Sequence, residues 1–330
     1  MTIVLGIEST AHTFGIGVVK NGKVLANVRD MYTTESGGII PMESAKHHEI
    51  VKLQLYQTAL SEAKISEGDI DVIAFSQAPG LAPCLKVGME LVKELSRKLK
   101  NPVVGVNHCI AHLEVGKITG AKNPVMLYVS GANTQIIAYA AGKYRVFGET
   151  LDLGVGNFID TVARFMGEGF PGGPKIEALA SKGKNYIELP YRVKGMDIAL
   201  AGIQTNLKQK FDSNKFSKNN LAYSLQETVF AMLVETAERA LAHTGKKELL
   251  LGGGVACNSR LQEMCKIMCK ERGAKFFVPF RNLLVDNAAM IAFLGEIMFN
   301  KKCNVYSYKK LEKLDFDPRQ RTDGVEVGWK

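Results

Sequence analysis

The stretch IVLGIESTAHTFGIGVVKNGKVLANVR, residues 3–29, decides the fold class of this chain. It contains three apolar runs separated by short polar turns: residues 3–7, 14–20 and 23–29. Asn21-Gly22 is a strong hairpin signal, because a type I′ turn needs positive φ at both of its central residues. The stretch therefore predicts a meander of three β-strands at the start of the chain.

The same pattern recurs about 120 residues later, in VMLYVSGANTQIIAYAAGKYRVFGE at 125–149. Aligning Leu5 with Leu127 places Glu8-Ser9-Thr10 opposite Ser130-Gly131-Ala132, and a Gly-Lys turn follows in both copies. A chance match of two meanders is the alternative, but the two coincidences together favour an internal duplication. We therefore expect an α/β protein of two related lobes.

After each meander, the apolar pattern predicts helices that alternate with short buried strands. Helices are expected at 44–63, 86–99, 155–166, 173–181, 219–243, 258–272 and 286–299, and further strands at 72–76, 103–106, 248–251 and 275–278. This pattern implies mixed sheets covered by helices, with a ligand cleft between the lobes. A lysine-rich segment at about 182–218 interrupts it and is expected to be an insertion with a basic face.

The chain has 330 residues and a formal net charge of +9, which favours an anionic partner such as nucleic acid or a nucleotide. A lysine-rich surface that only maintains solubility is the alternative. The six cysteines form no CxxC pair, which indicates reduced thiols and a cytoplasmic protein. Cys265 and Cys269 are expected to pack in a helix, with a metal clip as the alternative. The sequence has no signal peptide and no apolar stretch of the ~18 residues that a membrane helix needs, and only about the last twenty residues are a candidate for disorder.

His108 and His112 stand four residues apart, directly after Asn107, which is a good N-cap residue. On a helix this spacing puts both imidazoles on one face, within reach of one cation. The middle of the motif lacks the Glu of HExxH, so the general base of a zinc protease is missing. Taken alone, the pair is equally compatible with two ordinary histidines.

Several small-residue turns are candidate ligand sites. The turn at 130–134 is suited to present backbone N–H groups to an anion. The glycines at 252–254 follow a strand and precede a helix, where they allow the backbone to lie flat against a ligand. Asp160 and Glu177 stand beside Gly-rich turns and are suited to accept hydrogen bonds from ribose hydroxyls. Asp286 either caps the last expected helix or completes a metal site.

Nine motifs in this order resemble the universal tRNA threonylcarbamoyladenosine transferase family, once described as glycoprotein endopeptidases. They are GIEST (6–10), GGIIPMESAKHHE (37–49), SQAPGLAP (76–83), NHCIAH (107–112), LYVSGANTQ (127–135), GNFID (156–160), PGGPKIE (171–177), GGGVACNSRLQ (252–262) and DNAAMIA (286–292). The resemblance covers essentially the whole chain. It is nearest to the archaeal and eukaryotic branch, the catalytic subunit of the KEOPS complex.

The resemblance implies the duplicated actin/Hsp70/hexokinase fold, an α/β fold with a nucleotide cleft between its lobes. On that fold, the first lobe is expected to comprise residues 1–115 plus 295–330, and the second 116–294. The resemblance also implies one metal, iron with zinc as the alternative, and a donor site. The implied metal ligands are His108, His112 and Asp286, with Tyr128 as a further candidate. The implied donor contacts are Tyr128, Val129, Ser130, Gly131 and Ala132 for the activated group, and Asp160, Gly173, Glu177 and Asn258 for its adenosine part.

The implied reaction moves a threonylcarbamoyl group from threonylcarbamoyl-adenylate to the N6 amine of the adenosine 3′ of the anticodon. The acceptors are tRNAs that read codons beginning with A, AMP is released, and ATP or analogues would fit the donor site. The metal would act as a Lewis acid. Glu8 is the one candidate for a general base, and shaping the phosphate turn is its alternative role. The implied partners are tRNA, a small kinase/ATPase that is separate or fused at the C-terminus, and small accessory subunits.

Three positions depart from the commoner pattern of this family. Ala78 and Ala132 stand where Gly is frequent, and Ala201 stands where Ser is frequent. The sequence also leaves two other functions open. One is a non-catalytic, nucleotide-dependent scaffold, because a fold does not fix a function. The other is a metallopeptidase, against which the missing Glu argues.

Overall fold

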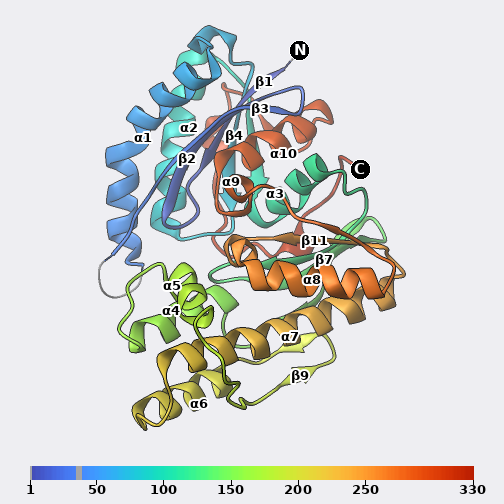
Figure 1. Ribbon diagram of the computed structural model, residues 1–330. Helices are drawn as coiled ribbons and strands as arrows, with labels where there is room; N and C mark the ends of the chain where they lie inside the picture. Colours follow the sequence, from blue (N-terminus) through green and yellow to red (C-terminus); the bar gives the residue numbers. More distant parts are fainter. Residues whose placement is uncertain (1, 35–38) are drawn as a thin grey trace. The chain divides into compact units, whose positions relative to one another are not determined.

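The computed structural model describes residues 2–34 and 39–330, so Gly37 and Gly38 of the GGIIPMESAKHHE motif lie outside the described residues (Figure 1). The described chain divides into two compact units. The first unit contains residues 2–33, 39–115 and 286–330, and the second contains residue 34 and residues 116–285. The first unit thus resumes at Asp286, ahead of the expected boundary at 295, because helix α10 (Ala288–Asn300) packs as a whole on strands of that unit.

The first unit is built on a six-stranded sheet with the order β13-β5-β4-β1-β2-β3. Its strands are β1 (Ile3–Glu8), β2 (Thr13–Lys20), β3 (Lys23–Met31), β4 (Val72–Ala78), β5 (Val103–Asn107) and β13 (Val305–Tyr306). The predicted meander is confirmed, because β1, β2 and β3 pair in antiparallel order. On its other edge β1 pairs in parallel with β4, and β4 pairs in parallel with β5. Asn21 and Gly22 have φ of 51° and 73°, as the hairpin signal requires.

Helices cover both faces of this sheet: α1 (Pro41–Ala63), α2 (Ala82–Leu99), α3 (His108–Val115) and α10. Figure 1 shows α1 and α2 on one side of the strands and α10 on the other. Alternation along β1 explains the two layers, because successive side chains of a strand point to opposite faces. Leu5 and Ile7 join the core that contains α1 and α2, whereas Gly6 between them faces α10.

The second unit repeats this plan around a five-stranded sheet with the order β12-β11-β6-β7-β8. Its strands are β6 (Val125–Val129), β7 (Thr134–Ala140), β8 (Lys143–Glu149), β11 (Glu248–Gly252) and β12 (Lys275–Phe277). Strands β6, β7 and β8 form a second antiparallel meander, and β6 pairs in parallel with β11. In both units, therefore, the first strand of a meander joins a parallel half-sheet, as the internal repeat predicts.

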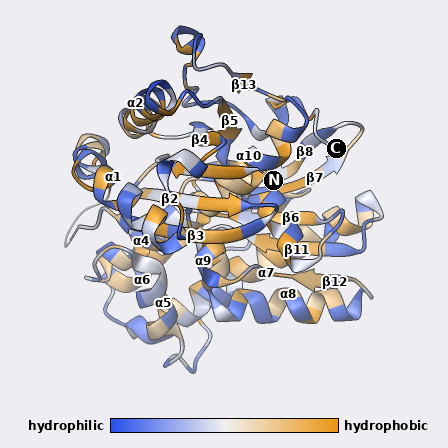
Figure 2. Cartoon of the chain, turned by 90° about the horizontal axis from the view of Figure 1, so that it is seen from above, coloured by the Kyte–Doolittle hydropathy of each residue, from blue (hydrophilic) through white to orange (hydrophobic). Residues whose placement is uncertain are grey.

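The helices of the second unit are α4 (Val155–Phe165), α5 (Gly172–Ala180), α6 (Ala201–Asp212), α7 (Lys218–Thr244), α8 (Ser259–Glu271) and α9 (Arg281–Leu284). Figure 2 shows hydrophilic and hydrophobic stretches alternating along α8, as expected for a helix with one buried face. Cys265 and Cys269 lie on that buried face, and burial raises the pKa of both thiols, that of Cys269 to about 11. Both side chains belong to the hydrophobic core of the second unit, which agrees with packing in a helix.

The basic insertion at 182–218 contains secondary structure that was not predicted from its sequence. It contains the short hairpin β9 (Val193–Lys194) and β10 (Asp197–Ile198), and helix α6. Leu200, Ile203 and Leu207 are fully buried in the core of the second unit. Leu189 and Ile198 belong to the same core, so five buried apolar residues anchor this segment.

The C-terminal residues form a packed strap and are not disordered. Gln320 accepts a hydrogen bond from the Asn107 side chain (2.9 Å), and Thr322 is buried. Trp329 is 5% exposed, and its Nε1 donates to Glu114 Oε1 (3.3 Å). The strap therefore contacts the residue before the start of α3 and a residue near the end of that helix. None of the helices in the described part combines the length and the apolar character that crossing a membrane requires.

A buried histidine in the first unit predicts acid sensitivity. His48 on α1 donates from Nε2 to the carbonyl of Ala11 (3.0 Å), and burial, helped by His47, lowers its pKa to about 4. The unfolded chain, with a His pKa near 6.5, binds the proton more tightly. Stability from this group is thus present above pH 6.5 and is lost as the pH falls towards 4. Urea unfolding should show about 2 kcal/mol lost between pH 7.5 and 5, and His48→Gln should remove this part of the slope. An unchanged slope in the variant would refute the assignment.

Candidate metal centre and donor-binding turns

Helix α3 carries His108 and His112, whose imidazole rings lie close together. Asn107 begins the helix as predicted, because its side-chain Oδ1 accepts from Ile110 N (3.1 Å) and so occupies an otherwise unpaired amide. His108 and His112 then lie on one face, with ring centroids 4.8 Å apart. Both are buried, at 6% and 2% exposed. The prediction that the two imidazoles lie on one face of a helix is therefore confirmed.

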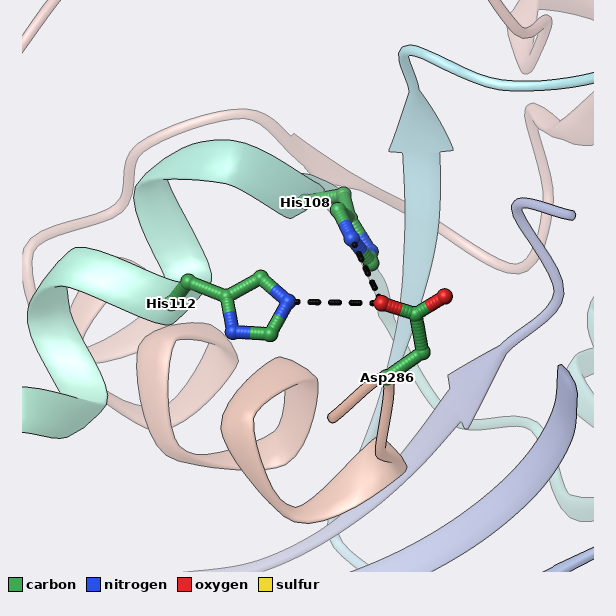
Figure 3. A group of neighbouring side chains, drawn as sticks. All are labelled: His108, His112 and Asp286. Atoms are coloured by element: carbon green, nitrogen blue, oxygen red, sulfur yellow. Dashed lines mark ion pairs between the residues drawn. The ribbon is translucent and has the colours of Figure 1, made fainter. Parts of the chain in front are cut away.

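Asp286, the first residue of the last segment of this unit, completes the group of three side chains (Figure 3). Its Oδ1 lies 3.3 Å from His108 Nε2 and 3.5 Å from His112 Nε2. The helix that follows is capped by Asn287, whose side chain accepts from Met290 N (3.0 Å). Asp286 therefore does not cap α10, and its carboxylate faces the two imidazoles.

The donor set fits a divalent transition metal. Two imidazole nitrogens and one carboxylate oxygen suit zinc or iron, and such ligands stand about 2.0–2.2 Å from the ion. Ligand atoms around one such ion are separated by distances close to the 3.3 and 3.5 Å found here. Three protein ligands also leave coordination positions open, which is typical of a catalytic and not a structural site.

The electrostatics of the group reflect its burial. Burial acts to lower the pKa of His108, but the carboxylates of Glu8 and Asp286 outweigh it and raise that pKa well above its usual value. Burial likewise acts to raise the pKa of Asp286, yet the His108 charge holds it well below its usual range. The pKa of His112 is lowered, chiefly by burial. A cation entering here meets a preformed carboxylate and one neutral imidazole.

A second set of predicted residues gathers in the other unit, around the turn between β6 and β7. Ser130 closes this turn: its N–H and its hydroxyl both donate to the carbonyl of Asn133 (2.8 and 3.0 Å). Gly131 and Ala132 form the exposed tip. Tyr128 and Val129, at the end of β6, are buried. The amide of Ser130 is therefore already paired within the turn.

Glycines bring three other segments against this turn. The first turn of α4 docks on it through bonds from Gly156 N to Ser130 O (3.0 Å) and Asn157 N to Gly131 O (2.9 Å). A Cβ at Gly156 would lie 2.6 Å from the Cα of Gly131. A Cβ at Gly253 would lie 2.6 Å from the carbonyl carbon of Val129, and its φ is +89°. These glycines serve the packing of the chain, and a ligand is not needed to explain them.

The residues expected to contact the adenosine are joined to neighbouring segments of the second unit by hydrogen bonds. Asp160 Oδ1 accepts from Gly172 N (2.8 Å), so the middle of α4 is joined to the first residue of α5, beside Gly173. Glu177 accepts from Ser259 N (2.8 Å) and Ser259 Oγ (2.6 Å), which joins α5 to α8. Asn258 caps α8 and donates to Gln226 (2.6 Å). Gln226, which the sequence did not single out, is the partner of Asn258 and carries no local signal.

The three successive glycines differ in role, and a matched pair of variants tests this. Gly253→Ala is expected to cost about 3 kcal/mol, because it combines positive φ with a clash against Val129. Gly254→Ala should change stability by less than about 0.5 kcal/mol, since nothing lies within 4 Å of its Cβ. Urea unfolding of both variants checks this. Equal losses would contradict the difference in packing.

Comparison with known proteins identifies the family of this chain. The profile of the family "tRNA N6-adenosine threonylcarbamoyltransferase" matches residues 23–293. A protein of that name from Thermococcus sibiricus is 55% identical over 327 residues, which is 99% of this chain and 100% of that protein. The chain belongs to this family. Another threonylcarbamoyltransferase, from Archaeoglobus fulgidus, is 50% identical over 99% of each chain.

Some relatives in the threonylcarbamoyltransferase family are longer. A protein from Methanosarcina mazei named "Probable bifunctional tRNA threonylcarbamoyladenosine biosynthesis protein" is 50% identical over 332 residues, which is 99% of this chain but 60% of that protein. This chain therefore aligns with only part of the longer protein.

Solved structures confirm the predicted duplicated actin/Hsp70/hexokinase fold. The HypF structure from T. kodakarensis has a TM-score of 0.65 at 17% identity, covering 91% of this chain and 48% of that one. Component A of (R)-2-hydroxyglutaryl-CoA dehydratase from Acidaminococcus fermentans has a TM-score of 0.56 at 12% identity, covering 95% and 100%. At these identities the likeness concerns the fold alone.

Proposed function

We propose that this chain transfers the threonylcarbamoyl group of threonylcarbamoyl-adenylate to the N6 amine of the adenosine 3′ of the anticodon, releasing AMP. The acceptors are tRNAs that read codons beginning with A. The observation that carries the proposal is family membership over the full length together with an assembled two-histidine, one-carboxylate group. The histidine motif has no Glu at its centre, which disfavours peptide hydrolysis.

His108, His112 and Asp286 would hold one divalent metal, iron with zinc as the alternative. Bound there, the metal supplies Lewis-acid polarisation of the donor and a template for it, which is worth several kcal/mol in the transition state. Tyr128 is a further candidate ligand or donor contact. The two histidines are held by the first turns of α3, so the geometry of the site is set before any ligand enters.

The second unit would bind the donor nucleotide. Gly131 and Ala132 are exposed residues whose backbone amides would bind an anionic phosphate, and the β6–β7 turn is rigidified by α4. Asp160, Gly173, Glu177 and Asn258 would surround the adenosine. Because Asp160, Glu177 and Asn258 already accept backbone bonds, their remaining oxygen lone pairs would serve the ribose. A purine amine is a weak nucleophile, so positioning should contribute as much as activation.

The tRNA would use the basic insertion. Lys208 lies over the ring of Phe165 and is already paired with Asp212 (2.5 Å), so its charge is largely satisfied. Lys210 lies over Phe216, at 5.4 Å from the ring centroid. Lys215 is exposed. Cations beside aromatic rings suit a nucleic-acid backbone with unstacked bases.

Charge removal in the insertion should therefore weaken tRNA binding unequally. The double variant Lys210→Ala/Lys215→Ala is expected to lower tRNA affinity and reduce the slope of log K against log salt by about 1 per lost phosphate contact. Lys208→Ala should have the smaller effect because of its pairing with Asp212. Filter binding at four salt concentrations measures this, with exposed Lys270→Ala on α8 as control. Slopes that match the wild type would exclude this surface.

The proposed partners are a small kinase/ATPase, separate or fused, and small accessory subunits, as in KEOPS-type assemblies. The longer relatives named "bifunctional" support a partner that can share one chain with this one. We place the protein in the cytoplasm, which its free cysteines support.

Reconstitution tests the proposal as a whole. Purified protein is incubated with its partner subunits, tRNA, labelled threonine, bicarbonate, ATP and the enzyme that makes the adenylate. Label should enter tRNA, stop after metal removal, and return with Fe(II) or Zn(II) added anaerobically, and the metal that restores more activity identifies the physiological one. No incorporation with either metal would reject the proposed activity.

A further inference from the structure

The carboxylate of Glu8 lies behind the metal centre and is fully buried. Its Oε2 is 2.9 Å from Nδ1 of His108, while Nε2 of the same ring faces Asp286 at 3.3 Å. An ionised carboxylate only accepts hydrogen bonds. Glu8 therefore holds the Nδ1 proton of His108, and a metal that takes Nε2 in place of a proton leaves the ring with its remaining proton on Nδ1.

The other oxygen of Glu8 is also occupied. Oε1 accepts from the backbone N–H of Thr10 (2.7 Å) and from its hydroxyl (2.5 Å). With both oxygens bound and no exposed surface, the side chain offers no route to a proton of an incoming amine. These contacts argue against Glu8 as the general base.

The turn that follows Glu8 is fixed by hydrogen bonds and by close packing against neighbouring segments. Ser9 N donates to Ser76 Oγ (3.0 Å), and Leu81 N donates to Thr10 O (2.7 Å). A Cβ at Gly80 would lie 2.5 Å from Thr10 O, and one at Gly88 would lie 3.0 Å from Ser9 Cβ. Strands β1, β4 and β5 are parallel neighbours, so their carboxyl ends meet where Glu8 and α3 begin their contact. The turn thus holds the Glu8 carboxylate in a fixed position against His108, the first residue of α3.

We infer that Glu8 is a positioning residue that fixes His108 as an Nε2 ligand, with Thr10 orienting the carboxylate in turn. The inference rests on the metal centre of the proposed function. It also gives different roles to the two equivalent turns of the internal repeat. The turn at Ser130–Ala132 would bind the donor, whereas the turn at Glu8–Thr10 would orient a metal ligand. A carboxylate behind a ligating imidazole fixes the ring and its tautomer, and its removal typically costs 10- to 100-fold in metal affinity.

Metal affinity and the tautomer of the ring distinguish this role from a catalytic or purely structural one. The variants are Glu8→Gln, Glu8→Ala and Thr10→Val, and the probe is Co(II) in competition with a chromophoric chelator. Glu8→Ala should bind Co(II) about 10- to 100-fold more weakly, with Glu8→Gln and Thr10→Val in between, because each keeps part of the network. ¹⁵N NMR of histidine-labelled protein loaded with Zn(II) should show His108 with its proton on Nδ1 and the metal on Nε2 in the wild type, and a mixture of Nδ1 and Nε2 ligation in Glu8→Ala.

Glu296 supplies the matched control. It is a buried carboxylate of the same unit that accepts from Asn21 N (2.6 Å) and Gly22 N (2.7 Å), away from the metal ligands. Glu296→Gln should bind Co(II) like the wild type. If Glu8→Ala does not fold, the near-isosteric Glu8→Gln and Thr10→Val still carry the test.

The outcomes are separable. Wild-type Co(II) affinity in Glu8→Ala and Glu8→Gln overturns the inference and leaves the proposed transferase intact. A kcat that stays a thousandfold low in Glu8→Gln at saturating metal, with unchanged metal affinity, also overturns it and makes Glu8 the base. Weakened affinity with kcat restored by saturating metal supports it. Weakened affinity in a protein that never modifies tRNA supports it and rejects the proposed activity.

Discussion

Replacing His108 by alanine is expected to lower kcat/KM for tRNA modification on the order of a thousandfold and to remove Co(II) binding, since Lewis-acid stabilisation of several kcal/mol would be lost. Asp286→Asn should have a similar effect on binding, because the amide keeps the shape but removes the anionic ligand. Inductively coupled plasma analysis and the threonine incorporation assay measure both quantities. Folding should persist, since the remaining core of the unit is untouched.

The control for this prediction is His243→Ala, an exposed histidine on α7 that should retain full metal content and activity. If His108→Ala modifies tRNA at the wild-type rate, the metal-site mechanism is wrong, whatever its metal content.

Gly17→Ala is expected to destabilise the first unit by about 3 kcal/mol or more. Gly6 and Gly17 pair across β1 and β2 and form a flat seat for the start of α10. A Cβ at Gly17 would lie 2.5 Å from Ala289 N, and backbone cannot move aside as a side-chain tip can. Because Asp286 precedes α10 by two residues, metal affinity should fall with stability.

Urea unfolding and Co(II) titration of Gly17→Ala test both parts of this prediction. Gly68→Ala is the control, since the nearest atom to its Cβ is 3.8 Å away. Wild-type stability in Gly17→Ala would show that α10 is not seated on these glycines.

Local signals made much of the fold predictable. The two meanders rest on hairpin turns with positive φ, at Asn21-Gly22 and at Ala141-Gly142, and such turns are encoded by two residues. The pair His108 and His112 rests on helical spacing, which is local as well. Helix α6 was missed, because few of its residues are apolar and tertiary burial of Ile203 and Leu207 stabilises it.

Non-local contacts were not predictable from one sequence. Glu8 and His108 are 100 residues apart, and only the parallel order of β1, β4 and β5 brings them together. The membership of residues 286–294 in the first unit depends on the glycine seat for α10. The glycines at 252–254 look equivalent in sequence, yet Gly253 packs on Val129 while Gly254 has open space.

The C-terminal strap has a mechanical consequence for the metal centre. Gln320 bonds to the residue that starts α3, and Trp329 bonds to Glu114, two residues beyond His112. The two bonds fix both ends of a helix only two turns long, so the strap helps to hold His108 and His112 in the orientation that brings them to Asp286.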